Sequence, residues 1–251
     1  MEVHHHPHVE KKNFKAYFLE FVMIFLAVTL GFFAETIRET ITENNASSEY
    51  AQSLIEDLKK DTSQLILDMN ELKFVNDRLD TFITIVHTKK INEVTGGTWY
   101  YYGRFGTRTT EFQTEDATLE QLKSSGALRY FGNHAIVNAL TQYDQSTQEL
   151  ESYLRYGLPY QSSMVDLRNR IFDAYYFLPV MDLNINNQTI DSFKQQHFSL
   201  LNDNGDIMIQ YASYCQLKSF NNKYILGLEI NILKNAEMLL DELSKKYKYK
   251  S

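Results

Sequence analysis

A histidine cluster near the N-terminus is the first group of side chains in this chain that could do chemistry. It comprises His4, His5, His6 and His8, whose imidazoles are common ligands of transition metals. Pro7 interrupts the run, and the short polar tail around it gives the rings no fixed geometry. We therefore interpret the cluster as a weak metal candidate and favour a disordered tail or a partner-binding segment.

The search for catalytic and ion-binding motifs gives little. The stretch DLNIN at 182–186 begins like a calcium loop, but its sixth position is Asn187 and its twelfth is Phe193, so the bidentate glutamate is missing. No nucleophile elbow, phosphate-binding loop, zinc-protease motif or dinucleotide fingerprint occurs. The single cysteine, Cys215, excludes an internal disulfide and a cysteine-based metal site. The sequence predicts that the protein is not an enzyme and uses no cofactor.

The side chains best suited to recognise a partner lie together in the middle of the chain: Trp99, Tyr100, Tyr101, Tyr102 and Arg104. Tryptophan, tyrosine and arginine are the favoured anchors of protein interfaces. We expect the segment 93–116 to form a short hairpin or structured loop, with Gly96 and Gly97 stopping the preceding helix. Two interpretations remain open, because such aromatics either close the end of a core or form a partner-docking loop.

Composition favours helices and argues against one class of partner. The 251 residues include only 3 prolines and 10 glycines, which is typical of a helical protein rather than a sheet. The net charge of −7 argues against nucleic acid, which calls for a basic surface.

The first predicted element is an apolar helix near the N-terminus. The segment Tyr17–Glu35 reads YFLEFVMIFLAVTLGFFAE, and about 18 residues of helix cover about 27 Å, close to the thickness of a bilayer core. Its phenylalanines point to several sides, so it lacks the polar face of a soluble helix. A buried core helix and a cleaved signal peptide are the alternatives, and we favour an uncleaved transmembrane helix.

Flanking charges predict the orientation of this helix. Lys11, Lys12 and Lys15 precede it, whereas Arg38 follows among acidic residues, so the N-terminus is expected in the cytoplasm. The protein is then expected in a bacterial inner membrane, with the bulk of the chain in the periplasm. The predicted divisions are a cytoplasmic tail (1–16), the span (17–35), a linker or helix extension (36–48) and a helical periplasmic domain (49–251).

One face of the span is predicted to pack against another span. Glu20, Ala27 and Gly31 fall within about 40° on a helical wheel, because 7 and 11 residues nearly complete two and three turns. Ala27 and Gly31 form a small-xxx-small pair, which allows two helices to approach closely.

The remainder of the chain predicts a helical bundle. A heptad pattern over 47–91 is interrupted by Asp61 and Asp68, and ENNASS at 43–48 is a plausible hinge before it. Further helices are expected from about 115 with a pause at 124–126, from 160 to 177, and from 204 to 247. Four helices with short connections are typical of an up-and-down bundle. The fourth would return to the membrane, where four lysines either face the lipid surface or are simply solvated: Lys245, Lys246, Lys248 and Lys250.

Three segments resemble a family of uncharacterised bacterial membrane proteins with one N-terminal span, a helical domain and an L-K-S-S-G-x-L motif. They are HHPHVEKKNFKAYFLEFVMIFLAVTLGFFAE at the start, LEQLKSSGALRYF in the middle and AEMLLDELSKKYK at the end. The resemblance implies the same topology and an all-α fold, and it supplies no activity.

We expect a structural or interaction protein of the cell envelope, in contact with membrane lipid, that forms a homo-oligomer or joins a membrane-protein partner. Two alternatives stay open. One is a ligand-sensing bundle that acts through a partner, and the other is an oligomeric pore with a carboxylate ring near Glu20.

Overall fold

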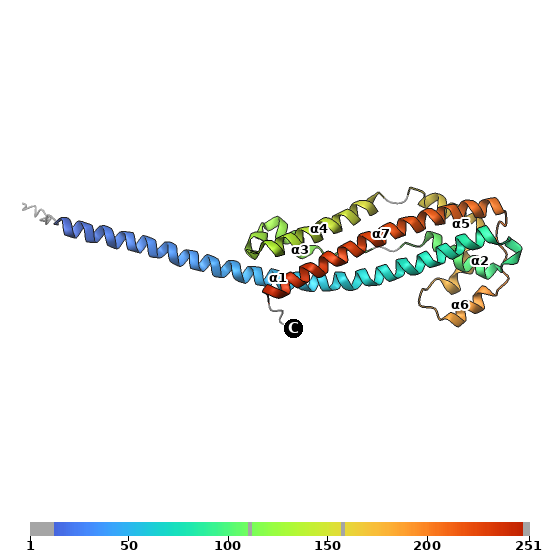
Figure 1. Cartoon of the computed structure of the whole chain (residues 1–251), viewed down its shortest axis with the longest axis horizontal. Coiled ribbons are helices and arrows are strands. Elements are labelled where there is room, and N and C mark those ends of the chain that lie inside the picture. The colour runs from blue at the N-terminus through green and yellow to red at the C-terminus, as the bar shows by residue number, and fades with distance from the viewer. Residues whose placement is uncertain (1–12, 110–111, 157–158, 248–251) are drawn as a thin grey trace, which may run out of the picture.

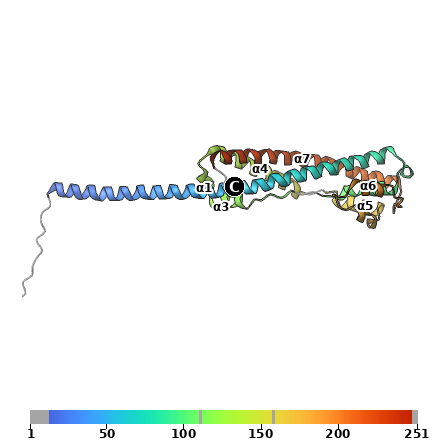
Figure 2. The same ribbon diagram turned by 90° about the horizontal axis from the view of Figure 1, so that it is seen from below.

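One helix, α1 (Phe14–Thr88), forms both a projecting stalk and one edge of an elongated head in this computed structural model (Figures 1 and 2). The structure describes residues 13–109, 112–156 and 159–247, and no strand occurs in these ranges, which confirms the all-α class. The other α-helices are α2 (Gly96–Gly103), α3 (Ala117–Ser125), α4 (His134–Arg155), α5 (Gln161–Ile171), α6 (Asn187–Lys194) and α7 (Gly205–Lys246). Four 3₁₀ helices connect them: η1 (Ile91–Glu93), η2 (Arg104–Thr107), η3 (Ala127–Phe131) and η4 (Ala174–Val180).

The expected hinge at 43–48 is wrong, because α1 passes through it without a break. The Ser47 hydroxyl donates to the Asn44 carbonyl at 2.9 Å within the helix instead of capping a new one. Each serine or asparagine in a helix costs only about 0.5 kcal/mol relative to alanine. The packing of the helical segment that follows can outweigh this cost. The helix-extension alternative for 36–48 is the one that the structure has.

The head is built on an antiparallel pair, α1 and α7, which run side by side along its length (Figure 1). The heptad residues of α1 face α7 and are buried, as their spacing predicts. They are Ala51, Leu58, Leu65, Leu72 and Leu79.

Two hydrophobic clusters divide the head. The proximal core, next to the stalk, joins α1 and α7 to α3, η3 and α4. The distal core joins the other ends of α1 and α7 to α2, α5, η4 and α6. Because α4 packs on one half of α7 and α5 on the other, the four longest head helices do not all run the length of the head (Figure 1).

Several helix ends follow the sequence signals. Gly126 adopts φ +69° after α3, and the Asn133 side chain caps α4 by accepting from the Ala135 amide at 2.9 Å. The helix expected to reach residue 177 instead ends at Ile171, and Pro179 lies inside η4. Between the helices expected at 160–177 and 204–247 the structure has a further helix, α6, whose first turn is capped by Asn186.

Gly96 and Gly97 begin α2 instead of only stopping the helix before it. A Cβ atom at Gly96 would lie 1.8 Å from the Phe198 carbonyl oxygen, and one at Gly97 would lie 2.0 Å from that of Phe193. These glycines therefore let the backbone of α2 touch the backbone at the end of α6 and just after it.

Candidate functional site

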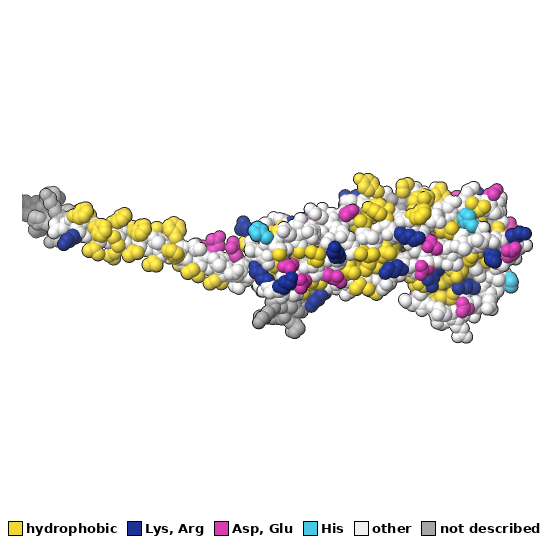
Figure 3. All heavy atoms as spheres, viewed as in Figure 1, with side chains coloured by type: hydrophobic (Ala, Val, Ile, Leu, Met, Phe, Trp, Pro, Cys, Tyr) yellow, Lys and Arg dark blue, Asp and Glu magenta, His cyan; other side chains and the backbone are white. Residues whose placement is uncertain are grey.

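The outer part of α1, residues 14–46, is named the stalk. An 18-residue window in it has a mean hydropathy of 2.1, and none of that window is buried. Figure 3 shows apolar side chains over most of the visible outer part of this helix, with acidic side chains nearer the head. Among the described helices it is the one long and apolar enough to cross a membrane, although a signal sequence near an N-terminus has the same length and composition.

The predicted packing face lies on this stalk. Glu20, Ala27 and Gly31 are all exposed, and a Cβ atom added to Gly31 would meet nothing within 4 Å. Because α1 is unbroken across them, their spacing of 7 and 11 residues places them on one side of one helix. The face is therefore accessible to another helix and is covered by no part of the head.

Of the two interpretations left open for the aromatic segment, the one in which its side chains close the end of a core fits their burial, and the partner-docking loop does not. Trp99, Tyr100 and Tyr101 are each at most 2% exposed, Tyr102 is half-buried and Arg104 is 9% exposed. The Tyr100 hydroxyl donates to the Ser199 carbonyl at 3.0 Å and accepts from the Asp173 amide at 2.9 Å. Large aromatic rings gain most by closing the distal core, so they are not available to a partner.

The lysine tail is engaged in the head where the structure describes it. The Lys245 ammonium lies 2.6 Å from an Asp241 carboxylate oxygen and 2.8 Å from one of Glu242, and Lys246 donates to the Phe131 carbonyl. Lys248 and Lys250 lie outside the described residues. The end of α7 lies beside α1 where the stalk enters the head, as a returning helix predicts (Figure 1).

Three polar layers interrupt the apolar packing of α1 in the head, the first against α4 and the other two against α7. In the first, Asp61 is 1% exposed, and its carboxylate accepts from the Tyr143 hydroxyl and from the Glu115 amide at 2.9 Å. Burial raises the pKa of Asp61, and these two hydrogen bonds oppose the rise. This layer ties α1 to α4 and to the segment before α3.

The second layer joins two carboxyl groups. Asp68 on α1 and Glu229 on α7 are both buried, and Glu229 is fully so. The pKa of Glu229 is raised to about 9. Burial is the largest cause, and the hydrogen bond with Asp68 and the negative charge of Asp68 add to it. At neutral pH the pair therefore holds a proton, because two carboxylates this close cannot both ionise without a large cost.

The third layer is an amide pair. Asn222 on α7 donates to the Asn76 side-chain oxygen at 3.0 Å, and Ser219 donates to Asp80 at 2.8 Å. The layers at 61, 68 and 76 recur about once per heptad, about 10–12 Å apart along the helix. Such layers weaken apolar packing and fix the register of two helices.

The sequence marks one member of each of two of these layers. Asp61 and Asp68 stand out because they fall at core positions of a heptad, which is a usable signal for a buried polar group. Their partners Tyr143 and Glu229 are far away in sequence, and no local pattern marks them.

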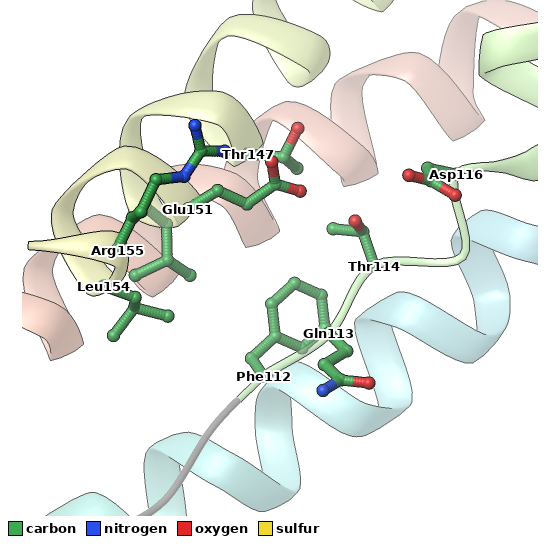
Figure 4. A pocket seen from close by; sticks show the side chains of 9 residues that line it. Phe112, Gln113, Thr114, Asp116, Thr147, Glu151, Leu154 and Arg155 are labelled. Atoms are coloured by element: carbon green, nitrogen blue, oxygen red, sulfur yellow. The ribbon is translucent and has the colours of Figure 1, made fainter. Parts of the chain in front are cut away.

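A groove of about 370 Å³ lies between the segment 112–116 and α4. Figure 4 shows Thr147, Glu151 and Arg155 on α4, across the groove from the segment that carries Asp116. Water reaches Asp116, Glu151 and Arg155, because all three are exposed. The groove therefore has solvated, mixed charges, and we assign it no ligand.

The histidine cluster lies outside the described residues, and no group of three potential metal ligands occurs within them. Comparison with known proteins finds no family model, no curated protein and no solved structure that matches this chain. The geometry of the stalk and the head is therefore what a functional interpretation rests on.

Proposed function

We propose that this chain is a single-span membrane protein that acts as a structural or interaction protein of the bacterial envelope. In this proposal the apolar part of the stalk lies in the inner membrane with the N-terminus in the cytoplasm. The head stands in the periplasm, and the span associates with a second copy or with another membrane protein.

The observation that carries the proposal is the complete exposure of the apolar stalk. The exposed fractions of its large side chains are about one half or more, with Phe14 at 84% and Phe32 at 71%. A continuous apolar surface of this kind is not stable in water and requires lipid or protein around it. Helix continuity into the head favours a retained anchor over a removable leader, because the same helix supplies the core residues of α1.

A second feature supports an interaction role for the head. Leu217, Phe220 and Tyr224 are each 48–60% exposed and follow one another at helical spacing on α7. This apolar stripe adds a surface outside the membrane to the packing face within it.

Disulfide cross-linking in native membranes tests the proposed association. Single cysteines replacing Ala27 or Gly31 should form dimers in higher yield than single cysteines replacing Phe25 or Phe32, because only the former lie on the small-residue face. The native chain is the background, since its Cys215 is fully buried.

Alkaline carbonate extraction of the same membranes provides the control for anchoring. The chain should remain with the lipid, whereas release into the soluble fraction would contradict the proposed span. Equal cross-linking at all four positions would contradict the packing face but not the span. The same holds if no position cross-links while the chain stays with the lipid.

A further inference from the structure

A small cavity in the distal half of the head collects arginine side chains. Its volume is about 160 Å³, and we name it the arginine pocket. It lies where η2, α5 and η4 meet, and its lining includes Arg104, Thr107, Arg108, Arg168 and Phe177. Such a gathering is unexpected in a chain whose net charge is −7.

Arg104 is the most buried of these arginines, with 9% of its surface exposed. Its Nε atom is buried and has no hydrogen-bond partner, and no described carboxylate forms an ion pair with its guanidinium. The group lies 4.4 Å from the Phe105 ring centre and 5.0 Å from that of Tyr101. These rings cover part of the guanidinium, and the side chain of Arg104 also lines the pocket, where its positive charge has no carboxylate partner among the described residues.

The other guanidiniums leave the pocket positively charged. Arg108 is paired with Glu71 at 2.9 Å, which neutralises one charge. Arg168 donates to two neutral acceptors, the Thr107 hydroxyl at 2.6 Å and the Asn169 side-chain oxygen at 2.8 Å. Two of the three charges that line the cavity therefore lack a carboxylate within the described chain.

The charges act on one another in the folded head. Burial lowers the pKa of Arg104 to about 10; the neighbouring Tyr101 opposes this shift, and the positive charges of Arg108 and Arg78 add to it. A bound anion would offset this repulsion.

The dimensions of the pocket restrict the ligand to a small group. Pockets that enclose a whole drug-sized molecule have volumes of about 300–1,000 Å³, well above the volume of this one. Guanidinium groups match the oxygen spacing of phosphate and carboxylate, and two unneutralised charges favour a dianion over a monoanion.

We propose that the arginine pocket binds a tetrahedral oxyanion, phosphate or sulfate, from solution. Arg104 and Arg168 are its charged ligands, and Thr107, which already accepts a hydrogen bond from Arg168, holds that side chain at the edge of the cavity.

The position of the pocket distinguishes a dissolved ion from a lipid headgroup. Arg108 contacts α1 at Glu71, and about 37 residues of continuous helix separate this level from residue 34 at the end of the apolar segment. That separation corresponds to about 55 Å, which is far beyond the headgroups of the membrane that would hold the stalk. The assignment to a dissolved ion instead of a lipid headgroup rests on the proposed span, whereas the proposed binding site itself does not.

Calorimetric titration of the full chain in detergent with sodium phosphate, at constant ionic strength, tests the site. We expect saturable binding with one phosphate per chain. Arg104→Gln and Arg168→Gln should each weaken it at least tenfold, because each removes a charge-assisted pair. The matched control is Arg170→Gln on the same helix, which alters an exposed arginine 3.7 Å from Asp166 and should leave the affinity unchanged.

Circular dichroism first shows that each variant is folded. If Arg104→Gln does not fold, the half-buried Arg168 decides the question through its own variant. The proposal would be overturned if titration with phosphate released no more heat than titration with chloride. It would also be overturned if Arg168→Gln bound phosphate with unchanged affinity. Binding of short-chain phosphatidic acid without binding of inorganic phosphate would overturn the assignment to a dissolved ion. None of these outcomes depends on whether the stalk spans a membrane.

Discussion

The Asp68–Glu229 pair illustrates how the surroundings of one carboxyl group change its chemistry. A glutamate in an unfolded chain ionises at its usual pKa of about 4.5, whereas Glu229 in the folded head has a pKa raised to about 9. The folded state therefore binds a proton that the unfolded state releases across this pH range. The contribution of this proton to stability is complete below the unfolded pKa and is lost as the pH rises through the folded pKa.

The pair predicts a measurable dependence of stability on pH. The free energy of unfolding should fall between about pH 5 and pH 9, with a contribution from Glu229 of up to about 1.4 kcal/mol per pH unit. Glu229→Gln cannot ionise and should remove this part of the slope. Denaturant unfolding of the full chain in detergent, followed by circular dichroism, measures it.

Glu237→Gln provides the control for this prediction, because Glu237 is exposed on the same helix. It should keep the slope of the native chain. Identical slopes for Glu229→Gln and the native chain would show that the buried pair does not hold the proton.

At the scale of elements, α2 is fixed by a close contact between two backbones. The Gly97 amide donates to the Gln196 carbonyl at 2.8 Å, and the Thr95 hydroxyl donates to the Lys194 carbonyl. This contact aligns α2 with α6 and brings Trp99 and Tyr100 into the distal core. Any side chain larger than hydrogen at Gly96 or Gly97 would force the two segments apart.

Substitution of these glycines should therefore lower stability sharply. Gly96→Ala would place a methyl group 1.8 Å from the Phe198 carbonyl oxygen and should reduce the free energy of unfolding by at least about 2 kcal/mol. Gly227→Ala is the matched control, because a Cβ atom there meets nothing within 4 Å and alanine favours a helix interior by about 0.5–1 kcal/mol. Thermal unfolding compares them, and equal effects of the two substitutions would contradict the backbone contact.

At the scale of the whole molecule, α1 joins two environments in one element. Its outer part has the properties of a bilayer helix and its inner part has those of a bundle helix, with no hinge between them. Residues 35–46 hold the head about 18 Å beyond the apolar segment. The lysines near the end of α7 are therefore farther from the proposed lipid surface than they would be if they faced it, as one of the two interpretations of the sequence has it.

Labelling of intact cells with a membrane-impermeant maleimide tests the proposed orientation. Ser53→Cys lies on an exposed position of the head and should react from the periplasmic side, whereas Lys15→Cys should react only after the inner membrane is opened. The native chain is the control, because burial raises the pKa of its Cys215 thiol to about 12 and no surface of it is exposed. The reverse pattern would contradict the orientation inferred from Lys11, Lys12 and Lys15.

Features that depend on neighbouring residues could be predicted from the sequence alone. Low proline and glycine content predicts an all-α chain, a heptad from Ala51 to Leu79 predicts one buried face of α1, and Asn133 marks a helix start. These signals are local, since each reflects the geometry of one helix or one turn.

Features that join distant residues could not be predicted in this way and follow from the folded arrangement of the helices. The burial of Trp99 and Tyr100 depends on α5, η4 and the segment after α6, and the proton held by Glu229 depends on Asp68 in another helix. The arginine pocket likewise brings Arg104 and Arg168 together from separate elements. Packing and charge act through space, so side chains 60 or more residues apart set these environments without leaving a periodic pattern in the chain.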